Sequence, residues 1–203
     1  AQAAAQEYMK VRAEQEQNEV SSAVDELATT DAEILRQVGD VRTTDAAGIT
    51  VIASDLRAER VEEIARKLNS EHAKHAFMKN AEYTQTGFHS FAGKHEDQQT
   101  QIAKVDANNA IFQGLINKAM VGSGNPKTME AVWTGLEATI SQDVVMGANP
   151  TLARVARTTA LVNPTIASMK RSNPKGALDL FYSKAQDLST EAQLRLKDEI
   201  DRE

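Results

Sequence analysis

The most regular hydrophobic pattern in the chain lies between residues 77 and 119. Mostly apolar residues recur there in alternating steps of three and four, without interruption, for about six heptad repeats. This spacing places one side chain per step along a single face of an α-helix, and such a face packs against a partner helix along its length. The seam consists of Phe77, Ala81, Thr84, Phe88, Phe91, His95, Gln98, Ile102, Val105, Asn109, Phe112, Ile116 and Ala119.

The pattern predicts one very long helix over residues 71–121, which at 1.5 Å per residue is roughly 75 Å long. A small globule cannot cover a helix of that length. Its partner is either the preceding segment 20–68 folded back antiparallel or the same helix of another subunit, and the residues leave both open. The polar seam positions are expected to fix register or oligomer state at a cost in stability. We predict an interaction seam formed by Phe77, Phe88, Phe91, Ile102, Val105, Phe112 and Ile116.

The first part of the chain also reads as helix. Residues 1–29 are rich in Ala, Gln and Glu, which favour helix, but carry few apolar side chains. The segment Thr30-Asp31-Ala32-Glu33 has the form of a capping box, and it either starts a fresh helix or lies within a continuing one. Gly39-Asp40 is predicted to end this segment. A further helix is expected to start at Thr44-Asp45 and to run to Asn69-Ser70.

All four prolines are preceded by asparagine, at positions 125–126, 149–150, 163–164 and 173–174. Asparagine is a favoured N-cap and proline a favoured first helical residue, so each pair predicts a helix start. The chain is expected to divide near Gly122-Ser123-Gly124 into a long-helix region, 1–122, and a compact short-helix array, 125–203. The predicted fold class is all-α: a long coiled-coil-like helical hairpin followed by a small array of short helices. The short helices are expected over residues 126–146, 150–162, 164–171, 174–186 and 190–202.

Composition narrows the function classes. Charged residues make up 26% of the chain, with both signs interspersed and a net charge of −6, so there is no strong nucleic-acid signature. There is no cysteine, which excludes disulfides and thiolate metal sites. No apolar run approaches the roughly 20 residues of a transmembrane segment, and no signal-peptide pattern is visible. Residue 1 is alanine, so we expect a processed product or a piece of a longer chain.

The best metal candidates are His72 and His75, beside Glu71, because a three-residue spacing places both imidazoles on one helical face. A zinc site needs three or four protein ligands, and the remaining histidines, His89 and His95, lie turns away on the same helix. Solvated or packed histidines therefore explain the pattern better. We predict no metal site and no cofactor, and His95 is expected to pack in the seam.

The candidate catalytic groups in the sequence are also better explained by a structural role. The carboxylates of Glu62 and Glu63 alternate with Arg60 and Arg66, which is typical of a solvated face and not of a site that shifts a pKa. The Gly122-Ser123-Gly124 segment lacks the strand and the lysine of a phosphate-binding loop, and no Ser/His/Asp arrangement can be assembled. We therefore predict no catalytic residue and a non-enzymatic protein. The aromatic residues Trp133, Phe181 and Tyr182 form either a ligand groove or, by the simpler interpretation, part of a packed core.

The order of these elements resembles the internal virion proteins, or ejection proteins, of short-tailed bacteriophages, over about residues 44–203. The resemblance starts with the helix Asp45–Leu68 and continues through Asn69-Ser70-Glu71 and Phe77 into the very long helix and the short helices. It ends in the hairpin Ser172-Asn173-Pro174-Lys175-Gly176-Ala177-Leu178-Asp179-Leu180-Phe181 and Leu188-Ser189-Thr190-Glu191-Ala192, a phrase that also recurs in unrelated helical repeats. The Glu-Ser-x-Phe type motif of the muramidase domain that some members carry is not found, and the resemblance carries over no active site.

Three hypotheses follow. The resemblance implies a structural virion protein that self-associates, binds other virion proteins and takes part in genome ejection across the host envelope. It would be located in the virion interior and then in the host cell envelope. The alternative is a bacterial helical adaptor or secretion-associated interaction module, located in the cytoplasm. The third is a hydrolase acting on the cell wall. A homo-oligomer is expected under the first hypothesis and a stable monomer with a foreign partner under the second.

Overall fold

The computed structural model describes residues 2–201, and the side chains of residues 5–199. Within that range the chain forms seven α-helices, two short 3₁₀ turns and no strand, so the predicted all-α class is confirmed. The elements are α1 (Gln2–Asp40), a 3₁₀ turn (Thr43–Ala46), α2 (Ile49–Lys67), α3 (Glu71–Gly122), α4 (Pro126–Val145), α5 (Pro150–Met169), α6 (Pro174–Lys184), a second 3₁₀ turn (Ala185–Asp187) and α7 (Thr190–Asp201).

The helices form two compact units, residues 1–103 and 104–203, and the division falls inside α3. The sequence placed the boundary at the loop after this helix, because glycines and a proline mark that loop. The last turns of α3 instead pack on the short helices through Phe112 and Ala119, which lie in one core with Val132 and Leu136 of α4. The C-terminal portion of α3 is therefore part of the second unit.

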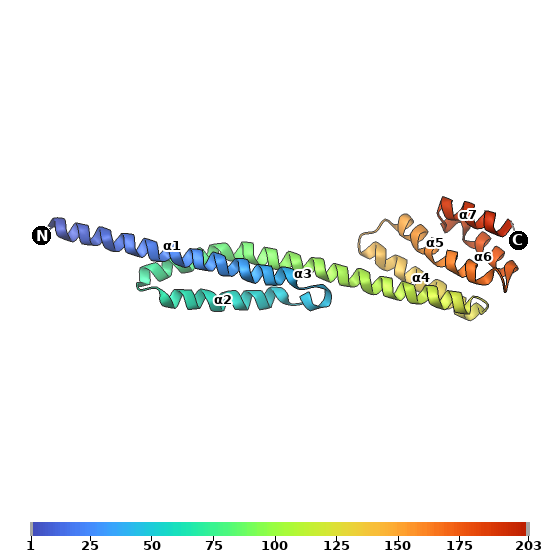
Figure 1. Ribbon diagram of the computed structural model, residues 1–203, viewed down its shortest axis with the longest axis horizontal. Helices are drawn as coiled ribbons and strands as arrows, with labels where there is room; N and C mark the ends of the chain where they lie inside the picture. Colours follow the sequence, from blue (N-terminus) through green and yellow to red (C-terminus); the bar gives the residue numbers. More distant parts are fainter. Residues whose placement is uncertain (1, 202–203) are drawn as a thin grey trace. The chain divides into compact units, whose positions relative to one another are not determined.

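The first unit is built from α1, α2 and the first part of α3, which lie side by side (Figure 1). One core lies around Phe77, which is fully buried against Leu27 of α1 and Ile64 of α2. A second core joins Phe88 to Val38 of α1 and to α2. The N-terminal part of the seam is thus covered within the chain, by the segment 20–68.

The connection from α1 to α2 differs from the prediction at one end. The helix α1 runs through Thr30-Asp31-Ala32-Glu33 without a break and ends at Asp40, as expected. The prediction that the next helix starts at Thr44 is wrong, because α2 begins only at Ile49. Gly48 adopts a left-handed conformation (φ 78°), which a continuing helix cannot contain and which glycine adopts at little steric cost.

The second unit contains α4–α7 and the last part of α3. Three of the four predicted helix starts are confirmed, because the side-chain oxygens of Asn125, Asn149 and Asn173 accept hydrogen bonds from backbone N–H groups of the first turns of α4, α5 and α6. These caps satisfy donors that a helix cannot satisfy internally.

The fourth predicted start is wrong: α5 passes through Asn163 and Pro164 and ends at Met169. A proline inside a helix removes one backbone hydrogen bond and costs about 3 kcal/mol. Burial of the apolar residues on both sides, Leu161 and Ile166 among them, offsets that cost at about 1.5–3 kcal/mol for each large side chain. Asn163 therefore does not cap a helix, and its side-chain oxygen is buried without a hydrogen-bond partner.

Phe77 and Phe91 of α3 provide a test of how α1 and α2 pack on this helix. Truncating fully buried Phe77 to Ala should lower the free energy of unfolding by about 3–5 kcal/mol, because it leaves a cavity between three helices. The same truncation at Phe91, which is 51% exposed, should cost less than about 1 kcal/mol. Urea unfolding followed by circular dichroism measures both, and equal costs would contradict the packing described here.

Candidate interaction surface

The seven predicted interaction residues divide into two groups. Four are used inside the chain: Phe77, Phe88 and Phe112 are buried, and Ile116 is half-buried against the same core as Phe112. The other three are exposed on α3, and they are Phe91 (51%), Ile102 (45%) and Val105 (41%). The seam is therefore a core along part of α3 and a solvent-facing apolar surface along another part. Whether a partner binds the exposed part stays a prediction.

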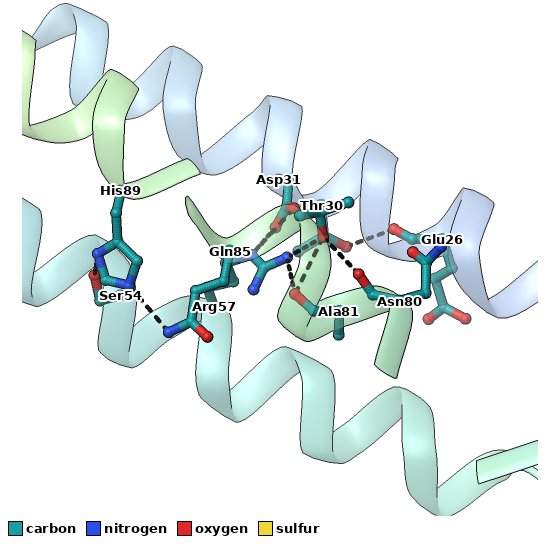
Figure 2. Close-up of polar contacts among 10 residues, drawn as sticks. Glu26, Thr30, Asp31, Ser54, Arg57, Asn80, Ala81, Gln85 and His89 are labelled. Carbon is teal, nitrogen blue, oxygen red and sulfur yellow. Dashed lines mark hydrogen bonds and ion pairs between the residues drawn. The ribbon is translucent and has the colours of Figure 1, made fainter. Parts of the chain in front are cut away.

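A buried arginine of α2 connects the three helices where α1 and α2 cover α3. Arg57 of α2 is 4% exposed, and its guanidinium pairs with Asp31 of α1 through Nε at 2.9 and 3.1 Å. The same guanidinium donates to the Ala81 carbonyl (3.1 Å) and to the Thr84 hydroxyl (2.8 Å) of α3, and lies 5.3 Å from the centre of the Phe88 ring. Figure 2 shows Arg57 between the three helices, with its contacts to Asp31 and Ala81 drawn as dashed lines.

The Asp31 carboxyl is the counter-ion in this network. Burial raises the pKa of Asp31, and the ion pair and hydrogen bond from Arg57 oppose that shift. Desolvation of both charges therefore consumes much of the gain from their attraction. The pair fixes the relative position of the helices more than it stabilises them, because either charge left alone in this position would be costly.

Three polar residues of α3 form hydrogen bonds at the point where α1 and α2 stop packing on this helix. The connector, residues 41–48, lies against α3, and His95 Nε2 donates to the Val41 carbonyl (2.8 Å). Gln99 accepts from the Thr43 N–H (2.9 Å). Glu96 accepts from the N–H groups of Gly48 (2.8 Å) and Thr50 (3.1 Å), so a side chain of α3 caps the start of α2.

These contacts explain the polar residues of this stretch of α3. His95 is a half-buried seam residue as predicted, and its ring holds a backbone carbonyl. The hydrogen bonds from Thr50 and from the Gly48 amide lower the pKa of Glu96. A carboxylate at a helix N-terminus is also favoured by the helix dipole.

The second unit contains a comparable arrangement. Arg157 of α5 pairs with Asp143 of α4 at 2.7 and 2.8 Å and lies over the Phe112 ring of α3, 4.6 Å from its centre. Asn108 of α3 donates to Asp143 (2.7 Å) and to the Thr139 carbonyl (3.0 Å). The hydrogen bond from Arg157 lowers the pKa of Asp143, against the effect of burial. In both units an arginine, a carboxylate and a phenylalanine of α3 join three helices.

One contact has the residue types of a catalytic pair. Ser54 Oγ lies 3.0 Å from His89 Nδ1, in an open groove of about 690 Å³ between α2 and α3 (Figure 2). The hydroxyl of Ser54 donates to the Thr50 carbonyl (2.6 Å), so His89 is the donor to Ser54, and Gln85 then donates to the other ring nitrogen (3.0 Å). A nucleophile must instead give its proton to the imidazole. The geometry is that of a structural hydrogen-bond chain.

The other sequence candidates lie apart. Over the described residues there is no group of three or more His, Cys, Asp or Glu side chains that would hold a metal ion, so His72 and His75 have no further ligand. Glu62 and Glu63 form exposed pairs with Arg66 and Arg60. No helix in residues 2–201 has the length and apolar character to cross a membrane.

The aromatic residues of the second unit pack mainly in its core. Phe181 is buried, and Trp133 is half-buried between the two cores of this unit, with Lys184 Nζ 4.2 Å from its ring centre. Tyr182 is 63% exposed and contacts the Phe181 ring edge to face. This favours the core interpretation of Trp133 and Phe181 over a ligand groove.

Reasoning from the sequence missed Arg57 and Asp31 as a central pair, although one signal was present. Arg57 lies four residues after Ala53 and four before Val61, so it occupies a core position of the apolar stripe of α2. A charged residue at such a position needs a buried partner, and its identity depends on the tertiary fold.

Comparison with protein families, with curated proteins and with solved structures found no match to this chain.

The Arg57–Asp31 pair makes a double-variant prediction. Asp31→Ala should lower the free energy of unfolding by about 3–5 kcal/mol, because Arg57 keeps its charge in a buried position. Replacing both residues, as Asp31→Leu with Arg57→Met, should restore most of that loss. Urea unfolding at neutral pH measures both, and a double variant as unstable as the single one would contradict this account.

The Glu96 cap makes a prediction for pH. Its folded pKa lies below the ordinary value of 4.5, so its contribution is present above that pH and is lost as the pH falls through the folded pKa. Glu96→Gln should therefore be less stable than the wild type at pH 7 and equal to it in strong acid. Chemical unfolding at pH 7 and pH 2–3 tests this, with the exposed neighbour substitution Asp97→Asn as the control. A gap of the same size at both pH values would count against the cap.

Proposed function

We propose that this chain is a non-enzymatic structural protein that assembles through its long helix. Its place is inside the virion of a short-tailed phage, where it takes part in delivering the genome across the host envelope. The observation that carries the assembly proposal is the exposure of Phe91, Ile102 and Val105 on α3. Exposed apolar side chains at heptad spacing are a typical surface for a partner helix.

Two further features support this proposal. The order of the helices and the Asn173-Pro174 hairpin carry the resemblance to ejection proteins, which are large helical proteins that leave the capsid with the genome. The chain lacks cysteine, and α3 contains glycines at 87, 93 and 114, which lower helix stability by about 1 kcal/mol each relative to alanine. Moderately stable helices without disulfides suit a protein that must pass a narrow channel, because helices reform locally and fast.

The second candidate is a helical adaptor that binds a different protein. One observation favours it: Phe77 and Phe88 are covered by α1 and α2 of the same chain, so the first unit does not need a second copy for its core. The exposed residues of α3 would then bind a foreign helix. Under this function the protein is a monomer located in the cytoplasm.

Light scattering after size exclusion, over a concentration series, separates the two functions. Under the leading proposal the wild type forms a homo-oligomer, and the double variant Phe91→Ser, Ile102→Ser weakens association at least about tenfold, because it removes the exposed apolar side chains. Tyr83→Ser is the matched control, because Tyr83 lies on α3 outside the seam and is 85% exposed.

A concentration-independent monomer would falsify the self-assembly proposal and put the adaptor first. Release of soluble fragments from peptidoglycan by the wild type would overturn the non-enzymatic assignment. Circular dichroism on the same samples shows whether each variant keeps its helix content.

A further inference from the structure

A second exposed surface lies on α2, on the side away from its core. Ile52 (54% exposed) and Leu56 (43% exposed) lie on this side, and Glu59 and Glu63 continue the same line in steps of three and four residues. Asp55 lies beside them and has no ion pair among those found in the described residues. We call Ile52, Asp55, Leu56, Glu59 and Glu63 the outer face of α2. It is apolar at one end and carries Glu59 and Glu63 at the other, where Glu63 forms an ion pair with Arg60.

The part of α3 in the second unit also has an exposed line, opposite its buried residues. Ile111 is 61% exposed and Val121 is 92% exposed. Between positions 104 and 125 the one acidic residue in the sequence is Asp106. The outer face of α3 consists of Lys104, Ala107, Ile111, Gly114, Lys118 and Val121, spaced in alternating steps of three and four. It combines apolar side chains, small residues and two lysines.

Packing within the chain does not require a glycine at position 114, as it does not at Gly87. A methyl group added at its Cα would meet nothing within 4 Å, so neither close packing nor an unusual φ requires a glycine there. A glycine inside an exposed helix costs about 1 kcal/mol relative to alanine. On a helix face that a second helix approaches, the missing side chain allows close contact between backbones.

The two units differ in net charge in the same direction as the outer faces of α2 and α3 do. Residues 1–103 contain 11 Lys and Arg against 18 Asp and Glu, and residues 104–203 contain 12 against 11. The first unit is therefore acidic and the second nearly neutral. Opposite charges on two apolar faces of one chain favour contact between copies and select one register.

We infer that the outer face of α3 binds the outer face of α2 of a second copy of this chain. With the helices parallel, Ile52 lies against Ile111 and Glu59 against Lys118. With the helices antiparallel, Ile52 still meets Ile111 and Glu59 meets Lys104. In both alignments Gly114 lies in the contact and an acidic residue meets a lysine.

This contact joins two different surfaces, so every copy still offers one free face of each kind. Such a heterologous interface produces a ring where the rotation closes and an open chain where it does not. It uses none of the exposed seam residues. It therefore adds a second mode of assembly to the proposed function, and of the possible results only a wild type that never associates would overturn both.

The first test is Gly114→Leu in the full chain, followed by sedimentation velocity over a concentration series. The substitution should weaken association at least about tenfold, because a large side chain separates the helices. The urea midpoint should not fall, because leucine favours helix over glycine. Gly87→Leu is the matched control, because Gly87 also lies exposed in α3 with nothing within 4 Å of an added Cβ. It should associate like the wild type.

The second test is a charge exchange. Glu59→Lys should weaken association, and raised salt should weaken wild-type association, because the pair is exposed and screened. Adding Lys118→Glu to Glu59→Lys should restore association if the helices are parallel, and Lys104→Glu should do so if they are antiparallel.

Three results would overturn this inference. They are a wild type that is monomeric at every concentration, a Gly114→Leu variant that associates like the wild type, and a Glu59→Lys defect that neither lysine exchange repairs. The seam variant Phe91→Ser, Ile102→Ser separates this failure from failure of the proposed function. If that variant alone abolishes association, the seam proposal stands and the contact between α2 and α3 does not.

Discussion

The relative position of the helices in the first unit depends on one buried guanidinium. Arg57 lies where α1, α2 and α3 meet, and a charge at 4% exposure is tolerable only while its partners stay in place. Asp31 comes from α1, whereas the Ala81 carbonyl, the Thr84 hydroxyl and the Phe88 ring come from α3. A shift of α1 along its axis would remove the carboxylate partner, and a shift of α3 would remove the carbonyl, hydroxyl and ring contacts. Apolar contacts between long helices tolerate sliding, and this network does not.

The length of α3 sets the second constraint. A 52-residue helix needs more cover than two neighbouring helices of the first unit can give, and its contacts with them end at the connector. His95, Glu96 and Gln99 hold that connector and the first turn of α2 by four hydrogen bonds to backbone groups. Their side chains are thus engaged in ending one packed region, whereas the neighbouring seam residues Phe91 and Ile102 have no apolar cover over half of their surface. The exposed seam follows from the mismatch between the helix and its cover.

Local signals in the sequence were enough for most of the helices. The heptad spacing predicted α3 within about one residue, and the asparagine–proline pairs predicted α4, α5 and α6, because a cap is an interaction within one turn. The same reasoning failed at Pro164, where burial of Leu161 and Ile166 keeps one helix intact across the proline. It failed again at Thr44, because the start of α2 is capped by Glu96, 47 residues beyond Ile49 in sequence. Both errors arise where tertiary packing outweighs local preference.

The candidate surface was predictable only in part, for a related reason. Periodicity identifies which residues share a helix face, but not which of them another part of the chain covers. Phe88 and Phe91 both lie in the seam, yet one is buried against α1 and α2 and the other is half exposed. Arg57 was missed because an arginine within an apolar stripe has meaning only once Asp31 is placed beside it.

The two proposed contacts differ in symmetry, and that difference bears on assembly. A seam that pairs with the same seam of a second copy closes after two subunits, since each surface is used up. A contact between the outer faces of α2 and α3 leaves a free face on every copy and so permits growth. The two contacts use different residues of the chain. A chain with one closed and one open contact can build rings or filaments of paired subunits, whereas the seam alone would stop at a pair. The open contact is exposed and charged, so assembly beyond the pair would also depend on salt, which the apolar seam would not.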